Sequence, residues 1–244
     1  MDISGKRALV TGASSGIGKS IAVALASSGV NVALLGRDRT RMDEAMQMMG
    51  SFPIRTVCCF ADVSSEEDVQ QAVRKAAEEF EGLDYLINCA GVSQRKGCLV
   101  EDIETDEYNR IMRTNVDSVL FCCREVMPYL KESDGAYIIN ILSTASFASG
   151  AGGGVYSASK YAARALHEAL EAGCKGSNIR VSAISPGPVN TNIWSHKLEE
   201  ISQQRKEKML RSQDIAEIAM FLLRLDPNVH IGNIKAEPWF YVKQ

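Results

Sequence analysis

The stretch RALVTGASSGIGKSIAVALASS, residues 7–28, joins a short apolar run to a longer amphipathic segment. The turn between them, TGASSGIG, contains Gly12, Gly16 and Gly18. Glycines in such a turn allow a tight reversal and let a pyrophosphate approach the amides at a helix N-terminus. A turn that needs only positive φ would have the same composition, because a glycine pattern by itself is weak evidence. The rest of the chain decides between these interpretations.

The same alternation of apolar runs and amphipathic segments continues along the chain. We expect strands at residues 6–11, 31–36, 54–60, 83–88, 136–142, 179–185 and near 230–237. We expect helices at residues 16–28, 39–49, 65–80, 106–130, 156–174 and 212–225. Strands that are apolar on both faces and alternate with helices predict a parallel sheet covered on both sides. The predicted fold is a Rossmann-type, doubly wound α/β/α sandwich of three layers with a mostly or wholly parallel, seven-stranded sheet.

This order of elements makes TGASSGIG the first strand–helix turn of a parallel α/β chain, where a dinucleotide site requires it. We therefore favour cofactor binding over a plain turn. One irregular segment, residues 186–211, interrupts the alternation after the carboxyl end of a strand. Doubly wound folds place ligand-covering elements there. We expect one domain over residues 1–244, with residues 186–211 covering the substrate.

The composition argues against several classes of protein. A net charge of −3 gives no support for a nucleic-acid or anionic-membrane partner. No apolar run is as long as a membrane span, and MDISGKRALVTG lacks the pattern of a signal peptide. No spacing of cysteine and histidine suits a metal, so we expect free thiols and a soluble, cytoplasmic protein. The seven cysteines are Cys58, Cys59, Cys89, Cys98, Cys122, Cys123 and Cys174.

The end of the second expected strand, LLGRDRTR at residues 34–41, bears on the choice of cofactor. An NAD site places an acid there for the ribose hydroxyl, whereas an NADP site supplies an arginine for the 2′-phosphate. Gly36 stands near the acid's place and Arg37 follows it. Asp38 could serve the ribose, but we favour it as the cap of the next helix. We expect NADP(H) rather than NAD(H), with Ser14 and Arg37 contacting the 2′-phosphate.

The stretch NILSTASFASGAGGGVYSASK, residues 140–160, brings three reactive side chains together. Tyr156 and Lys160 are four residues apart and share one helix face, and Ser143 follows the preceding strand. A phenol has a pKa of about 10, and a nearby ammonium group favours the phenolate. Such a tyrosine can exchange a proton with a carbonyl or an alcohol oxygen. Each residue also has a simpler interpretation, as a surface pair or a turn cap, and only their shared placement favours chemistry.

Several motifs occur in a characteristic order along nearly the whole chain. They are TGASSGIG at residues 11–18, Asp62-Val63, NCAG at Asn88–Gly91, Asn115, Ser143, YSASK at Tyr156–Lys160 and PGPVNT at Pro186–Thr191. In this order the chain resembles the short-chain dehydrogenase/reductase (SDR) superfamily, in the single-domain form that has about the length of this chain.

The resemblance implies roles for individual residues. Tyr156 is the expected acid/base, Lys160 lowers its pKa and holds the ribose hydroxyls, Ser143 donates to the substrate oxygen, and Asn115 fixes a water. The expected cofactor contacts are Gly12, Ser14, Ser15, Gly16, Ile17, Gly18, Arg37, Asp62, Val63, Asn88, Ala90, Gly91, Tyr156, Lys160, Pro186, Gly187, Val189 and Thr191. Among these, the resemblance places Asp62 and Val63 on the adenine and Pro186, Val189 and Thr191 on the nicotinamide.

Two features depart from the family's pattern. Cys89 replaces the second asparagine of the family's NNAG motif. Because we expect this position mainly to support the sheet, we expect little loss from the replacement. The chain ends EPWFYVKQ, whereas the family's acyl-carrier reductases end in a DGG-type tail. This difference argues against a role in fatty-acid elongation.

The sequence therefore predicts an NADP(H)-preferring oxidoreductase that interconverts a small carbonyl compound and a secondary alcohol. The alternative is a non-catalytic dinucleotide sensor or scaffold, against which the set of Ser143, Tyr156 and Lys160 argues. The resemblance also implies a homodimer or homotetramer built on the helices near residues 106–130 and 156–174. The apolar residues that we expect in this contact are Val119, Phe121, Cys122, Ala162, Ala165, Leu166 and Ala169.

Overall fold

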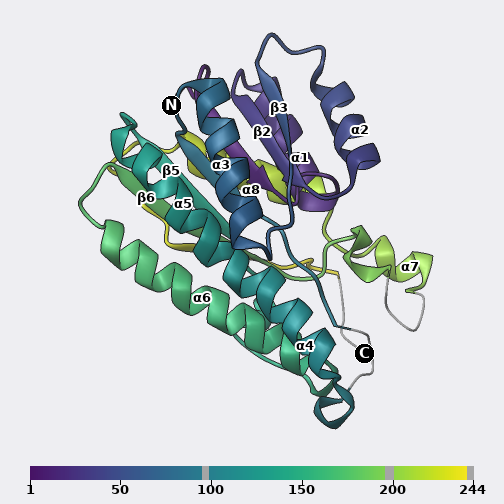
Figure 1. Ribbon diagram of the computed structural model, residues 1–244. Coiled ribbons are helices and arrows are strands. Elements are labelled where there is room, and N and C mark those ends of the chain that lie inside the picture. Colours follow the sequence, from purple (N-terminus) through teal and green to yellow (C-terminus); the bar gives the residue numbers. More distant parts are fainter. Residues whose placement is uncertain (95–98, 196–200, 241–244) are drawn as a thin grey trace.

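Within residues 1–94, 99–195 and 201–240, which the computed structural model describes, seven strands form one sheet (Figure 1). Every neighbouring pair is parallel, and the order is β3-β2-β1-β4-β5-β6-β7. This sheet confirms the predicted fold class. The strands are β1 (Arg7–Thr11), β2 (Asn31–Gly36), β3 (Thr56–Phe60), β4 (Tyr85–Asn88), β5 (Ala136–Ile141), β6 (Ile179–Pro186) and β7 (Asn233–Ala236).

Cys98, residues 196–200 of the expected covering segment and the last four residues of the C-terminal tail lie outside the described residues. The described part of the covering segment contains a short 3₁₀ turn at Asn192–Trp194 and the short helix α7 (Gln203–Lys206). An isolated bridge between Val189 and Leu210 joins its two ends. The end of the covering segment therefore lies next to its start, just after the carboxyl end of β6.

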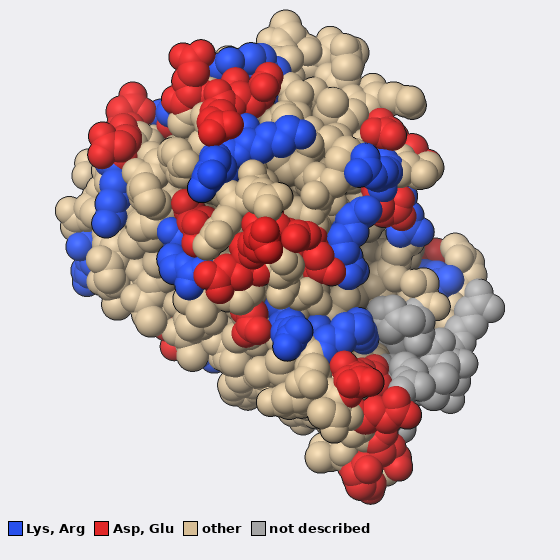
Figure 2. Space-filling view, in the orientation of Figure 1, with Lys and Arg blue, Asp and Glu red and all other residues tan. Residues whose placement is uncertain are grey.

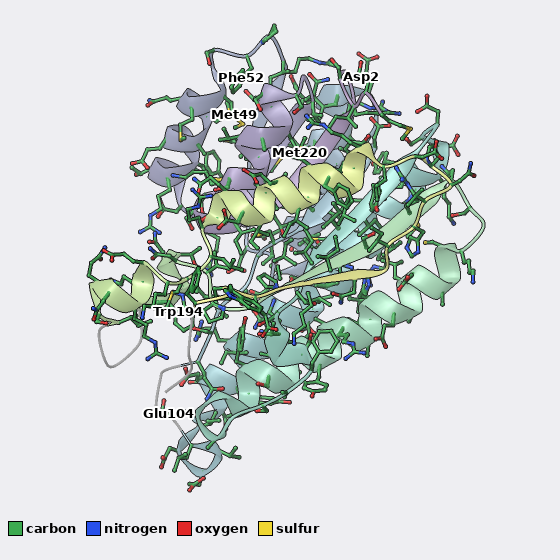
Figure 3. The ribbon with its side chains drawn as sticks, turned by 180° about the vertical axis from the view of Figure 1, so that it is seen from behind. Asp2, Met49, Phe52, Glu104, Trp194 and Met220 are labelled. Atoms are coloured by element: carbon green, nitrogen blue, oxygen red, sulfur yellow. The ribbon has the colours of Figure 1, made fainter. Side chains whose placement is uncertain are left out.

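Helices cover both faces of the sheet, which makes the three layers. One face carries α1 (Gly16–Ser27), α2 (Arg39–Met49) and α8 (Ser212–Arg224), whose core includes the labelled Met49 and Met220 of Figure 3. The other face, in front of the sheet in Figure 1, carries α3 (Glu66–Phe80), α5 (Ser118–Glu132) and α6 (Gly154–Cys174). Because both faces are covered, the central strands are apolar on both sides, as the sequence predicts.

Side-chain caps fix where two of these helices begin. Asp38 accepts a hydrogen bond from the Arg41 amide at 3.1 Å, which agrees with its expected role as the cap of α2. Ser65 accepts from the Asp68 amide at 3.2 Å at the start of α3. Each such cap stabilises a helix by about 1 kcal/mol. The caps also set the turns after β2 and β3, which lie at the edge of the sheet where the strands end.

The single helix expected at residues 106–130 is divided in the structure. Helix α4 (Thr105–Met112) is followed by a wide π-helical turn at Arg113–Asp117 and then by α5. Such turns are rare and occur frequently at functional sites. Asn115 lies within this turn, so periodicity predicts the helical path but misses the local widening.

The turns after β1 and β4 meet at the point where the strand order reverses. Gly12, after β1, has a φ of +65°. A Cβ atom at this position would lie 2.9 Å from the Ala90 Cα, which follows β4. Only glycine fits both the backbone conformation and this contact. In open α/β sheets ligands bind at the carboxyl ends of the strands beside such a reversal, so this contact marks the expected site.

Charges of both signs are mixed over the face of the molecule in Figure 2. Acidic and basic side chains lie next to one another over most of this face, with a group of acidic residues at its lower edge. Within the described parts of the chain, no helix has the length and apolar character to cross a membrane.

Candidate active site

Two cavities open at the carboxyl edge of the sheet. The first, which we call the glycine-turn cavity, has a volume of about 330 Å³. It lies between the turn after β1, the end of β2, the turn after β4 and the segment after β6. The sheet thus gathers parts of the chain that are distant in sequence around one space. Of the residues predicted to hold a cofactor, those that line it are Gly12, Ser14, Ser15, Gly16, Ile17, Gly18, Arg37, Val63, Ala90, Gly91 and Thr191.

The glycines of the first turn stand at positions where a side chain would collide with neighbouring atoms of the protein. Gly16 has a φ of +55°. A Cβ atom at Gly18 would lie 2.3 Å from the carbonyl oxygen of Gly12. Ser15, which precedes α1, makes no capping hydrogen bond through its side chain. Amides in the first turn of a helix have no acceptor within the helix, so this turn suits an anionic group such as a pyrophosphate.

Arg37 and Asp62 form an ion pair at the rim of the glycine-turn cavity. Their closest nitrogen and oxygen are 2.9 Å apart. Burial by itself would raise the pKa of the Asp62 carboxyl, but hydrogen bonds from Ser64 and Arg37 outweigh it and hold this pKa below its ordinary value. Asp62 is not among the lining residues, and its carboxylate accepts hydrogen bonds from Ser64 and Arg37.

Arg41 also lines the glycine-turn cavity, a position that the sequence does not predict. It lies in the first turn of α2 and pairs with Asp38 at 3.3 Å. In sequence it is one of several arginines near the start of a predicted helix, where a solvated side chain is the usual outcome. Only the packing of α2 beside the turn after β1 turns Arg41 toward the same space as Arg37.

The second cavity, which we call the Tyr156 cavity, has a volume of about 240 Å³. It adjoins the first, because five residues line both: Ile17, Cys89, Gly91, Thr191 and Ile193. Except for Asn115, the residues predicted for chemistry and for the nicotinamide line this second space. They are Ser143, Tyr156, Lys160, Pro186, Gly187, Val189 and Thr191. The structure therefore brings the two sets of predicted residues into one continuous site.

Three of the four predicted catalytic side chains, Ser143, Tyr156 and Lys160, converge from the end of β5 and from α6. Ser143, two residues after β5, accepts a hydrogen bond from the Ala145 amide at 3.1 Å. Lys160 donates to the Ile141 carbonyl oxygen at 3.1 Å, and its Nζ lies 6.0 Å from the centroid of the Tyr156 ring. The backbone at the end of β5 therefore fixes both the serine and the lysine around the phenol.

Burial dominates the protonation of this group. It raises the pKa of the Tyr156 phenol, and a hydrogen bond with Ser143 acts in the opposite direction. Burial also lowers the pKa of Lys160 to about 8. In the protein alone, therefore, the phenol is held in its protonated form at neutral pH, and the lysine titrates much nearer to neutrality than an ordinary amine.

A model of the family described as short chain dehydrogenase matches residues 6–202. The chain belongs to the short-chain dehydrogenase family. The resemblance found in the sequence is thereby confirmed, and with it an oxidoreductase family and the Rossmann-type fold.

Relatives and solved structures agree with this family. An uncharacterized oxidoreductase of Staphylococcus saprophyticus is 33% identical over 239 residues, which cover 98% of this chain and 99% of the relative. The structure of an alcohol dehydrogenase from Thermococcus sibiricus, complexed with 5-hydroxy-NADP, is 27% identical with a TM-score of 0.86, covering 98% of this chain and 99% of that one. A 3-ketoacyl-(acyl-carrier-protein) reductase from Brucella melitensis, complexed with NADH, is also 27% identical, with a TM-score of 0.88 and the same coverage.

Besides Asp62, two of the predicted residues of this short-chain dehydrogenase line neither cavity. Asn88 is buried in the sheet, where its amide donates to Asn140 at 2.9 Å and to Cys123 at 3.3 Å. The side chain of Asn115 joins the segment after β4 to α6, since it binds both backbone groups of Val92 and the Ser159 hydroxyl at 2.8–2.9 Å. Neither side chain lines a cavity, and the amide groups of both make hydrogen bonds to other groups of the protein.

Cys89 corrects one expectation from the sequence. We expect this position to support the sheet, but β4 ends at Asn88 and Cys89 lines both cavities of the dehydrogenase. Burial raises the pKa of its thiol to about 12, so the thiol is uncharged at neutral pH. The replacement of asparagine by cysteine therefore changes the surface of the site itself and not only its support.

The wall of the Tyr156 cavity contains residues that the sequence does not single out. Trp194, labelled in Figure 3, lies on the segment after β6, and its indole N–H donates to the Val189 carbonyl oxygen at 2.7 Å. Opposite parts of the wall are the small residues Gly152 and Gly153 and the amide of Gln94. No sequence motif marks these positions, because the covering segment and the loop before α6 meet only in the folded chain.

Proposed function

We propose that this short-chain dehydrogenase is an NADP(H)-preferring enzyme that interconverts a carbonyl and a secondary alcohol on a small molecule. One observation carries the proposal: Ser143, Tyr156 and Lys160 line a cavity that adjoins the glycine-turn cavity along shared walls. A dinucleotide held in the glycine-turn cavity can therefore extend its nicotinamide into the Tyr156 cavity, beside the acid/base group.

The glycine-turn cavity fits a dinucleotide on structural grounds. Side chains at Gly12 or Gly18, which line it, would collide with the backbone of the surrounding turns. The start of α1 offers uncapped amides for a pyrophosphate. Val63 and Ala90 line it as apolar surfaces for an adenosine. When bound, a nicotinamide dinucleotide supplies or accepts the hydride that these side chains cannot provide.

In the proposed reaction the protein's own residues handle the proton. In the direction of reduction, Tyr156 donates its phenolic proton to the carbonyl oxygen, which receives a negative charge as the carbon is reduced. Ser143 holds the same oxygen through its hydroxyl. In the direction of oxidation, Tyr156 takes the proton of the alcohol, and the Lys160 ammonium lowers the phenol's pKa for this step.

The preference for NADP(H) is supported by the arginines at the rim of the glycine-turn cavity. Arg37 and Arg41 both line it, beside Ser14 and with no carboxylate among the lining residues described. Arginine recognises phosphate through charge-assisted hydrogen bonds. The Thermococcus sibiricus relative is complexed with an NADP derivative, and the Brucella melitensis relative with NADH. The arginines therefore favour NADP(H), and NAD(H) stays the alternative.

The direct test uses NADPH and a panel of uncharged carbonyl compounds: cyclohexanone, acetophenone, 2,3-butanedione and benzaldehyde. Oxidation of NADPH is followed in their presence, and each reaction is repeated with NADH. We expect turnover of at least one compound and a higher kcat/KM with NADPH. Tight binding of NADPH without oxidation by any compound would instead favour the alternative of a dinucleotide sensor.

We also infer a homodimer or homotetramer in which α5 and α6 pack against a second copy. The structure corrects the residues involved, because Val119 and Cys122 face the core and Cys122 is 0% exposed. The exposed apolar side chains are instead Leu120 on α5, 46% exposed, and Tyr161 on α6, 44% exposed. Ala165, one helical turn after Tyr161 on α6, is also exposed, and its small side chain leaves room for a close helix contact.

A further inference from the structure

Gln94 is a buried amide that connects the wall of the Tyr156 cavity to the first turn of α6. It is only 1% exposed and lines that cavity. Its Oε1 accepts a hydrogen bond from the Tyr156 backbone amide at 2.9 Å, and its Nε2 donates to the Gly152 carbonyl oxygen at 3.0 Å. One side chain thus holds both the loop before α6 and the backbone of the proposed acid/base.

The Tyr156 amide depends on an acceptor from outside the helix. Helix α6 begins at Gly154, so this amide lies in the first turn and has no partner within the helix. Gly153, the residue before α6, has no side chain that could cap it. Gln94 therefore performs the task of a capping residue from a distant part of the chain.

The carbonyl group of Tyr156 is tied to the same segment. The Ser159 hydroxyl donates to this carbonyl at 2.7 Å. Asn115 in turn donates to the Ser159 hydroxyl and to the Val92 carbonyl, each at 2.9 Å. Val92 and Gln94 are two residues apart on the segment after β4. The amide of Tyr156 is therefore bonded directly to the segment after β4, and its carbonyl is connected to the same segment through Ser159 and Asn115.

We propose that Gln94 is a positioning residue that fixes the backbone of Tyr156 and thereby places its phenol relative to Ser143 and Lys160. The inference rests on the proposed role of Tyr156 as acid/base. The phenol follows its backbone, because only two side-chain torsions separate them. A displacement of about 1 Å in a reacting group can cost about 100-fold in rate.

Two variants of similar size separate the parts of this role. Gln94→Met fills the same space but removes both the acceptor and the donor. Gln94→Glu keeps an oxygen for the Tyr156 amide, and the N-terminus of a helix favours its negative charge. The negative charge in Gln94→Glu would raise the pKa of the Tyr156 phenol. This does not harm the reduction, in which Tyr156 must be protonated. We expect Gln94→Glu to restore most of what Gln94→Met loses.

The first readout is amide hydrogen exchange at Tyr156 in the protein without cofactor or substrate. An amide that loses its only acceptor exchanges faster, because less opening is needed. We expect exchange at Tyr156 to be at least ~10-fold faster in Gln94→Met than in the wild type. In Gln94→Glu we expect protection close to that of the wild type. This readout needs no catalytic activity.

The second readout is the separation of kcat from KM in the reduction of the panel ketone that the wild type turns over fastest. We expect kcat to fall by about 10-fold to 100-fold in Gln94→Met, with the KM for NADPH unchanged. The matched control is Asn178→Leu. Asn178 lies beyond the C-terminal end of α6, and the substitution removes the hydrogen bonds that its side-chain amide donates to the Leu130 and Ser133 carbonyl oxygens. It is expected to lower the unfolding midpoint without a change in kcat or in exchange at Tyr156.

Each outcome decides the matter. Unchanged exchange at Tyr156 in Gln94→Met, or faster exchange with kcat within twofold of the wild type, overturns the proposal. If Gln94→Met does not fold, Gln94→Asn, one methylene too short to reach the amide, replaces it under the same criteria. Tyr156→Phe is measured alongside. If that variant stays active, the proposed function fails, whereas an inactive Tyr156→Phe with a normal Gln94→Met refutes the positioning role alone.

Discussion

The Arg37 guanidinium donates a hydrogen bond to the Asp62 carboxylate at 2.9 Å and joins the turns that follow β2 and β3. Because these strands are neighbours in the sheet, the two residues meet although 25 positions separate them. The pair keeps the arginine at the rim of the glycine-turn cavity. An acid thus holds the arginine for which we propose contact with the 2′-phosphate of NADP(H).

Reversing the charge at Arg37 should change the choice of cofactor. We expect Arg37→Asp to weaken NADPH binding by about 10-fold to 100-fold, because a charged hydrogen bond is lost and a repulsion is added. NADH should bind equally well or better. The measurement is a fluorescence titration with each cofactor. Arg39→Asp is the matched control, since Arg39 stacks on Phe60 and does not line the cavity. Tighter binding of NADH than of NADPH by the wild type would refute the assignment.

The glycine turn makes a prediction about stability and binding together. In Gly18→Ala the new methyl group would lie 2.3 Å from a backbone oxygen, so the turn must shift. We expect a loss of about 1–3 kcal/mol in the free energy of unfolding and weaker NADPH binding. Gly173→Ala in α6 has no atom within 4 Å of the new methyl and should instead gain up to about 1 kcal/mol. Denaturant titrations of both variants test this contrast, and equal effects would contradict it.

The buried Lys160 predicts a pH-dependent stability. Its pKa is lowered from 10.5 to about 8 in the folded protein. Between these values the unfolded chain binds more protons, so stability rises with pH. The cost of burying the ammonium is fully present below pH ~8 and is lost as the pH approaches the unfolded value of ~10.4. It amounts to about 3 kcal/mol.

The measurement compares the cofactor-free wild type with Lys160→Met. At pH ~7 the variant should be the more stable protein, and its advantage should decrease steadily up to pH ~10. Unfolding free energies from denaturant titrations at several pH values give the difference. An advantage that does not vary with pH would mean that the folded lysine has an ordinary pKa.

The proposed assembly predicts which surface changes break it. Leu120→Arg or Ala165→Arg places a charge on the exposed face of α5 or α6, and we expect either to yield a monomer. Met48→Arg on α2, which is equally exposed, should leave the assembly intact. Light scattering measures the mass of each protein. A wild type that is already a monomer of 26.6 kDa at micromolar concentration would rule out the assembly.

The fold could be predicted closely from the sequence, because its signals are local. Apolar runs of strand length alternate with helical periodicity, and the expected bounds of α2 and β2 agree with the structure to the residue. The cap by Asp38 follows from its own place before α2. The π-helical turn at Asn115 could not be predicted this way, because no local pattern marks it. In the structure Asn115 bonds to Val92, from another part of the chain.

The site was predictable only where a motif marks it. Periodicity does not tell which face of α5 meets the sheet, so the sequence predicts Val119 and Cys122 at a subunit contact although they belong to the core. Arg41 and Gln94 line the cavities because separate turns meet there, and no spacing in the sequence encodes that meeting. Long-range packing, not local propensity, decides these positions.

The central claim is that the phenol of Tyr156, and not its ring, carries the proton transfer. The most direct measurement compares wild type and Tyr156→Phe in a single turnover of NADPH with the best ketone of the panel, together with the Kd for NADPH. We predict a loss of at least ~1000-fold in the rate of NADPH oxidation, in the range that general acid catalysis contributes, with the Kd changed less than about twofold. A Tyr156→Phe protein that reduces the ketone at a near-normal rate would contradict the account.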